Sequence, residues 1–148
     1  MTDITNLSTV NVAISNYIAV VTMNNPPVNA QNRQFHDDLT LAFDVLSDRD
    51  DVRSIVLTGA GKCFSAGADI KGRVSQKSDL GGHWGHSRRV RECFYSIMEC
   101  RKPVIAAING AALGAGLAVA ASADILIASE SASIGLPEIN VGLLGGGR

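Results

Sequence analysis

Two turns rich in glycine and alanine carry the clearest chemical signal in the sequence. One lies in SIVLTGAGKCFSAGADIK and the other in PVIAAINGAALGAGLAVA, and each follows an apolar stretch typical of a strand and opens a helix. Such small residues let another backbone or a ligand approach closely, and the first N–H groups of a helix have no partner within it. Two turns facing each other could aim two N–H groups at one oxygen, as in an oxyanion hole. The residues alone also fit a tightly packed core turn, and by themselves they favour that alternative.

Other glycine and histidine motifs do not satisfy the chemistry they suggest. GAGK at 59–62 is no phosphate-binding P-loop, because Val56 stands where the first glycine is required and Cys63 follows the lysine in place of Ser or Thr. Neither GxGxxG nor GxSxG occurs. His83 and His86 lack a convincing third ligand, so we expect no metal site and interpret them as loop histidines.

The composition indicates one globular domain without a nucleic-acid or membrane partner. The chain has 148 residues, 46% of them hydrophobic and 18% charged, with a formal net charge of −1. Glycines, Asn109 and Asp124 interrupt the nearly uncharged stretch 103–128, which argues against a spanning helix. The cysteines have no CxxC spacing, which favours a reducing compartment and a cytoplasmic location.

The elements that must position the two turns alternate between strand and helix. Apolar periodicity predicts strands over 10–15, 17–23, 53–59, 102–109 and 124–129, and helices over 32–48, 86–100 and 116–123. Asn32 is the expected N-cap of the first helix. This order predicts an α/β fold with parallel strand pairs. The chain ends in the glycine-rich stretch 142–148, so we expect it to be a fragment of a longer domain.

Four motifs together resemble the crotonase superfamily, the enoyl-CoA hydratases and isomerases. They are NPPVNAQN (25–32), FSAGADIK (64–71), KPVIAAINGAALGAGLAVAASADILIAS (102–129) and SIGLPEINVGLLGGG (133–147). Their order and spacing match the family over nearly the whole chain. The resemblance implies a crotonase-like spiral of ββα units, with residues 1–148 forming a single core domain that lacks the family's C-terminal helical region.

The resemblance also implies chemistry on acyl-CoA thioesters, in which coenzyme A is the carrier of the substrate and no separate cofactor is needed. Members of the family stabilise a thioester enolate, and the matching oxyanion donors here are the N–H groups of Ala68 and Ala115. Homotrimers, or dimers of trimers, are implied as well. The residues implied to bind substrate or coenzyme A are Val28, Ala66, Asp69, Ile70 and Gly114.

The acid–base residues separate the possible reactions. Hydratases of the family use two glutamates; one is matched by Glu138 in LPEI, but the other position is Ala118 here. A single carboxylate suits a proton shuttle between two carbons better than addition of water, so we expect double-bond isomerisation. His83 or His86 could instead supply the second group for a hydratase, and Trp84 could line the acyl pocket.

A second class of function remains open from the sequence. Loss of the carboxylate at Ala118 would also suit a non-catalytic homologue that only binds acyl-CoA, although retention of Glu138 speaks against it. A binder of nucleotide phosphates is disfavoured because both phosphate fingerprints are absent. Asp124, which begins the last predicted strand, is expected to have a structural role.

Overall fold

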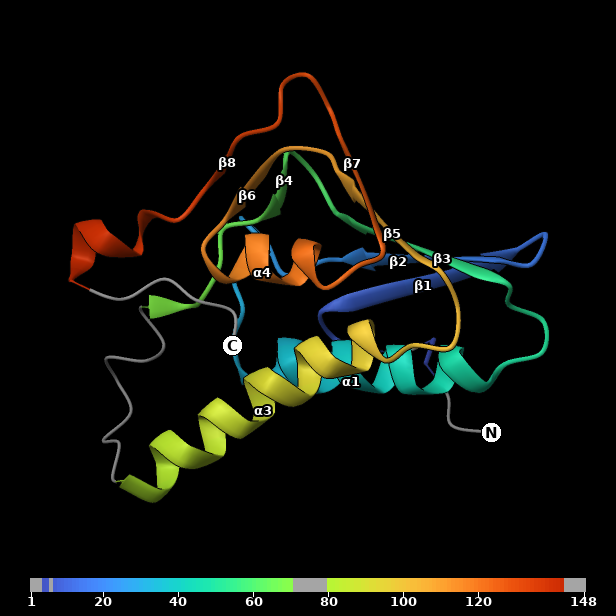
Figure 1. The fold of residues 1–148 in the computed structure, drawn as a ribbon, viewed down its shortest axis with the longest axis horizontal. Coiled ribbons are helices and arrows are strands. Elements are labelled where there is room, and N and C mark those ends of the chain that lie inside the picture. Colours follow the sequence, from blue (N-terminus) through green and yellow to red (C-terminus); the bar gives the residue numbers. More distant parts are fainter. Residues whose placement is uncertain (1–3, 6, 71–79, 143–148) are drawn as a thin grey trace.

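The computed structural model describes residues 4–5, 7–70 and 80–142. Two sheets are present, one of five strands in the order β1-β2-β3-β5-β7 and one of three strands in the order β4-β6-β8. Helices α1 and α3 lie side by side on one side of the larger sheet, and α4 lies between them and the smaller sheet (Figure 1). The strands are β1 (Val10–Ser15), β2 (Ile18–Met23), β3 (Ser54–Gly59), β4 (Cys63–Ser65), β5 (Val104–Ile108), β6 (Ala111–Leu113), β7 (Ile125–Ala128) and β8 (Ile134–Gly135). The helices are α1 (Arg33–Asp48), α3 (Leu80–Met98), α4 (Ala115–Ala121) and the 3-10 helix η1 (Pro137–Val141).

The larger sheet confirms the predicted parallel pairing. A tight turn joins β1 and β2 into an antiparallel hairpin, and Asn16 and Tyr17 in that turn have positive φ angles. From β2 onward the neighbours β2–β3, β3–β5 and β5–β7 are all parallel. Asp124 supports the last of these strands, because its carboxylate accepts from the Val104 N–H at 2.8 Å. The structural role expected of this aspartate is therefore confirmed.

Helix α1 forms where the apolar spacing predicts it. The side chain of Asn32 accepts from the Phe35 N–H at 2.9 Å, so the predicted N-cap is confirmed. The apolar face of the helix is fully buried in the core that it shares with the sheet and α3, and each of its Phe and Leu side chains contributes about 1.5–3 kcal/mol to the free energy of folding. Its buried apolar residues are Phe35, Leu39, Ala42, Phe43 and Leu46.

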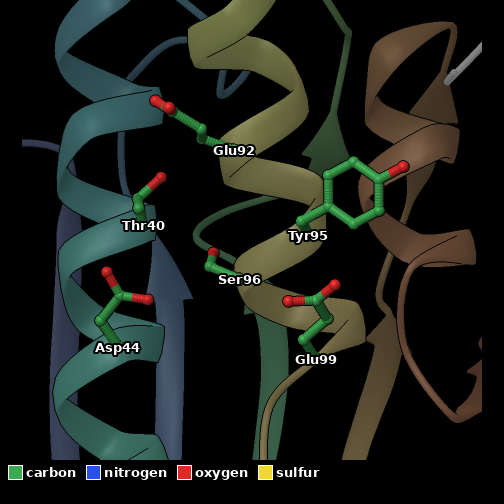
Figure 2. A pocket seen from close by; sticks show the side chains of 6 residues that line it. All are labelled: Thr40, Asp44, Glu92, Tyr95, Ser96 and Glu99. Carbon is green, nitrogen blue, oxygen red and sulfur yellow. The ribbon is translucent and has the colours of Figure 1, made fainter.

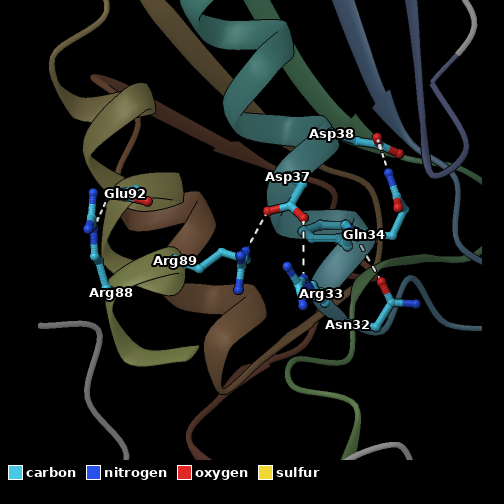
Figure 3. Close-up of polar contacts among 9 residues, drawn as sticks. Asn32, Arg33, Gln34, Asp37, Asp38, Arg88, Arg89 and Glu92 are labelled. Atoms are coloured by element: carbon cyan, nitrogen blue, oxygen red, sulfur yellow. Dashed lines mark hydrogen bonds and ion pairs between the residues drawn. The ribbon is translucent and has the colours of Figure 1, made fainter. Parts of the chain in front are cut away.

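Polar contacts join α1 to its neighbours, and Figure 3 shows the contact between α1 and α3. The buried carboxylate of Asp38 accepts from the N–H and the hydroxyl of Thr9, at 2.9 and 2.8 Å. Arg89 on α3 pairs with Asp37 on α1 at 2.6 Å. Exposed ion pairs of this kind contribute at most about 1 kcal/mol, so apolar packing in the shared core contributes more to holding the two helices together.

The described part of α3 begins earlier than the sequence predicts. It includes Leu80, six residues before the expected start at His86, so His83 and Trp84 lie on a helix and the interpretation of this segment as a loop is wrong. Glycine has a low helix propensity. The glycines in GGHWGH also interrupt the apolar period, so the sequence does not predict a helix there.

The apolar stretch 103–128 is divided among strands β5 to β7 and the short helix α4. Among the described residues, no helix is both long and apolar enough to cross a membrane.

Candidate functional site

The three-stranded sheet collects three of the predicted site residues at one edge. Strand β6 pairs in parallel with β4 on one side and with β8 on the other. The carboxyl ends of parallel strands meet at the same edge of a sheet. Ala68 follows the end of β4, Ala115 follows β6 and Glu138 follows β8. The three strands, which Figure 1 shows together, therefore bring residues that are far apart in the sequence to one edge.

The two glycine turns lie in direct backbone contact. Gly67 has a φ of +87°, and a Cβ at this position would lie 2.6 Å from the carbonyl oxygen of Leu113 and 3.2 Å from the nitrogen of Ala115. A Cβ on Gly116 would overlap the carbonyl oxygen of Ser65. Only glycine at both positions permits this approach, so the small residues serve the meeting of the two turns.

The main-chain geometry places the N–H groups of both predicted donors outside the hydrogen bonds of the bridge and of helix α4, and their role stays a prediction. Ala68 forms a parallel bridge with Gln31, in which the Gln31 N–H donates to Gly67 at 2.8 Å and the Asp69 N–H donates to Gln31 at 3.0 Å. Because these bonds flank Ala68, its own N–H points to the opposite side. Ala115 is the first residue of α4, so its N–H has no partner within the helix.

Glu138 packs against the second turn. Gly114 donates its N–H to the Gly135 carbonyl at 2.9 Å, which ties this turn to the end of β8. The φ of Gly114 is +55°, and a Cβ there would overlap the carboxylate of Glu138. The Oε2 atom of this carboxylate is buried and has no hydrogen-bond partner among the described residues. The acid–base role expected of Glu138 needs a carboxylate oxygen that is not already bonded, and that role stays a prediction.

The residues expected to bind coenzyme A surround the first turn. Ala66 donates its N–H to the Val28 carbonyl at 3.0 Å, and Asp69 is bonded to Gln31 as described above. The apolar side chains of Val28 and Ile70 are 39% and 53% exposed, which leaves them accessible to a ligand. The structure thus groups these residues, and their role in binding stays a prediction.

The remaining predicted residues lie on helices. Ala118 donates its N–H to the Gly114 carbonyl at 3.1 Å, so its methyl group occupies α4 one turn after the glycine turn. Trp84 is 70% exposed near the start of α3. The ring of His86 faces that of His36 on α1, with centroids 6.1 Å apart. The roles suggested for Trp84, His83 and His86 stay predictions.

An open groove of about 540 Å³ between α1 and α3 is separate from these residues. Figure 2 shows its six lining residues, none of which belongs to the predicted site. Burial, with a smaller contribution from Asp48, raises the pKa of Asp44 in its wall. The lining residues are Thr40, Asp44, Glu92, Tyr95, Ser96 and Glu99.

Three of the buried polar residues in the described part of the chain were not predicted from the sequence to take part in the site, namely Gln31, Ser65 and His36. His36 falls on the apolar face of α1, where a single histidine gives no signal of its own. Burial, together with His86, lowers the pKa of His36 to about 4. The imidazole is therefore neutral at physiological pH.

Protonation of His36 should make the fold sensitive to acid. The pKa is about 4 in the folded chain and 6.5 in the unfolded chain, so the unfolded chain binds the extra proton between these values. The free energy of unfolding should be highest above pH 6.5 and fall by up to about 3 kcal/mol as the pH drops to 4. Urea unfolding of His36→Leu across this range should lose that part of the acid dependence. The matched exposed change His83→Leu should retain it, and equal acid dependence in both variants would show that His36 is not the group responsible.

Comparisons with known proteins agree with this arrangement. Residues 13–147 match the family model described as enoyl-CoA hydratase/isomerase. A probable enoyl-CoA hydratase of Bacillus subtilis is 39% identical over 140 residues, which is 95% of this chain and 54% of the relative. A (7aS)-7a-methyl-1,5-dioxo-2,3,5,6,7,7a-hexahydro-1H-indene-carboxyl-CoA hydrolase of Mycobacterium tuberculosis is 36% identical over 128 residues, covering 86% of this chain and 51% of that protein.

A solved structure shows the same fold. Pseudomonas aeruginosa DspI is 37% identical, with a TM-score of 0.85 over 93% of this chain and 56% of the DspI chain. The crotonase-like fold predicted from the motifs is therefore confirmed. The present chain spans about half the length of the relatives it matches.

Proposed function

Because the chain belongs to the enoyl-CoA hydratase/isomerase family, we propose that it processes acyl-CoA thioesters through an enolate. The observation that carries this proposal is the meeting of Ala68, Ala115 and Glu138 at one edge of the smaller sheet. Two backbone donors and one carboxylate at a single place are the minimum set for moving a proton next to a carbonyl group.

The mechanism follows from these groups. The N–H groups of Ala68 and Ala115 bind the thioester oxygen and stabilise the negative charge that develops on it. Because the enolate is stabilised, a C–H bond next to the carbonyl becomes more acidic, and the Glu138 carboxylate takes the proton. Coenzyme A extends from this point along Val28, Ala66, Asp69 and Ile70, and it leaves with the product, so no separate cofactor takes part.

Isomerisation of a double bond is the reaction that best fits this carboxylate. Glu138 removes a proton from one carbon and returns it to another on the same face of the dienolate. Ala118 supplies no second proton carrier on α4. A hydratase that uses His83 or His86 as its second group is the alternative. We further propose a homotrimer or a dimer of trimers in the cytoplasm, and the free thiols of the three cysteines support a reducing compartment.

Exchange of α-protons with solvent tests the proposal most directly. The protein should incorporate deuterium from D2O into the α position of butanoyl-CoA, a saturated thioester that can form the enolate and can neither be hydrated nor isomerised. Mass spectrometry measures the incorporation. Binding of butanoyl-CoA without exchange would instead identify a non-catalytic acyl-CoA-binding homologue. Parallel assays with 2-enoyl-CoA and 3-enoyl-CoA then separate hydration from isomerisation through loss or gain of enone absorbance.

Removal of a single backbone N–H should identify the oxyanion donors. Replacing Ala68 or Ala115 by lactic acid changes one amide to an ester and keeps the methyl side chain. Each replacement should slow α-proton exchange by about a hundredfold to a thousandfold, because it removes one donor to the developing charge. The same replacement at Ala121, at the far end of α4, is the matched control. Exchange as fast in both site variants as in this control would exclude the two N–H groups as donors.

A further inference from the structure

Gln31 is a buried polar residue whose main chain borders the first turn. It is 2% exposed and lies in the loop before α1. Its N–H and its carbonyl bond to the residues on either side of Ala68, as described above. The Gln31 backbone thus determines the direction in which the Ala68 N–H points.

The side chain of Gln31 reaches the same turn by a second route. Its Nε2 donates to the Ser65 hydroxyl at 3.4 Å, and the Gly67 N–H donates to that hydroxyl at 3.3 Å. Ser65 in turn donates to the Asn29 carbonyl at 2.8 Å. The hydroxyl therefore makes every hydrogen bond it can, one as donor and two as acceptor. Ser65 and Gly67, two of the three residues just before Ala68, are held by hydrogen bonds of this hydroxyl.

His36 contacts the oxygen end of the Gln31 amide. Its Nε2 lies 3.3 Å from Gln31 Oε1, and the tautomer that carries the proton on Nε2 donates to this oxygen. The Nδ1 atom is buried without a hydrogen-bond partner among the described residues. With its oxygen turned to His36, the amide presents its NH2 group to Ser65. Gln31 donates to Ser65, and Ser65 donates to Asn29, so His36, Gln31 and Ser65 form a continuous polar chain that ends at the Asn29 carbonyl.

We propose that Gln31 is a positioning residue for the oxyanion hole, and that its side chain, oriented by His36, fixes through Ser65 the turn that presents the Ala68 N–H. This inference rests on the proposed function. The main-chain bridge to Gln31 fixes the direction of the Ala68 N–H but does not hold the residues just before Ala68. The Ser65 hydroxyl holds those residues through its bonds to Gly67 and Asn29. Small displacements at a reacting centre have large effects on rate. The side-chain contact through Ser65 therefore adds to the main-chain bridge in holding the Ala68 N–H in place.

Polarisation of a bound thioester measures this positioning directly. In the unchanged protein, the carbonyl stretch of butanoyl-CoA, isotopically labelled at the thioester carbonyl, should shift to lower frequency on binding. In Gln31→Met, which keeps the length of the side chain and removes both polar ends, the shift should shrink and α-proton exchange should slow by about tenfold or more. Affinity for butanoyl-CoA should change little, so the effect appears in kcat and not in KM. The same substitution at Gln34, on the exposed side of α1, should leave the shift and the exchange rate unchanged.

The outcomes separate this inference from the proposed function. If the unchanged protein shows neither a frequency shift nor exchange, the proposed function fails. If the unchanged protein shows both and folded Gln31→Met retains both in full, the proposed function stands and the positioning role of Gln31 is wrong. Should Gln31→Met fail to fold, Ser65→Ala provides the same test, because it removes the shared hydroxyl and leaves the Gln31 main chain in place. A full shift in Ser65→Ala would also overturn the proposal.

Discussion

Glu138→Gln should reduce α-proton exchange and turnover by about a hundredfold to ten-thousandfold, the usual contribution of a positioned acid–base group. Glutamine keeps the shape that packs on Gly114 but cannot accept the proton. Affinity for butanoyl-CoA should therefore stay close to that of the unchanged protein. The two measurements are exchange into D2O and binding by calorimetry. Loss of exchange with retained binding is the expected result.

Glu130→Gln provides the matched control for this variant. Glu130 is an exposed carboxylate in the turn between β7 and β8, outside the cluster formed by the two glycine turns and Glu138. Its substitution should leave exchange unchanged. Full exchange activity in Glu138→Gln would assign the proton transfer to another group, and His83 or His86 would then be the next residues to replace.

Gly67→Ala should have the second large effect, because it separates the two turns. The added methyl group would lie 2.6 Å from the Leu113 carbonyl oxygen, closer than real Cβ atoms approach, and the φ of +87° is strained for alanine. The backbone must move, which displaces the Ala68 N–H from that of Ala115. Exchange should fall by about a hundredfold or more, similar to the loss of one oxyanion donor. Thermal unfolding measured by circular dichroism should show a lower Tm.

Gly61→Ala is the control that measures the effect of backbone strain alone, without loss of contact between the two turns. Gly61 also has a positive φ, +72°, but a Cβ there meets nothing within 4 Å. This variant should lose about 1–3 kcal/mol of stability from strain alone and keep its exchange rate. If Gly67→Ala exchanges protons as fast as Gly61→Ala, contact between the turns is not needed for the chemistry.

The longer elements could be predicted from the sequence because their signals are local. Helix α1 has an apolar face with a helical period and an N-cap, and both are properties of neighbouring residues. The strands of the larger sheet are four to six residues long and carry enough β-branched residues to be recognised. The start of α3 could not be predicted, because its glycines have a low propensity for helix and do not contribute to a periodic pattern.

The smaller sheet could not be predicted for a different reason. Strands β4, β6 and β8 have only two or three residues each, too few to show a periodic pattern. They exist because each pairs with a strand distant in the sequence. The contacts from His36 to Gln31 and from Gln31 to Ser65 could not be predicted either, since each residue alone gives no signal and only their distances connect them.

By itself, the sequence determined the identities of the chemical groups: two turns rich in glycine and alanine, one carboxylate at Glu138 and none at Ala118. It also determined the family, through four motifs in a recognisable order. Only the tertiary structure decided that the two turns meet, that Glu138 packs on Gly114 and that Gln31 borders Ala68. The reason is physical: residue types follow from local chain chemistry, whereas the distance between two backbone amides depends on parallel pairing between strands that the sequence separates widely.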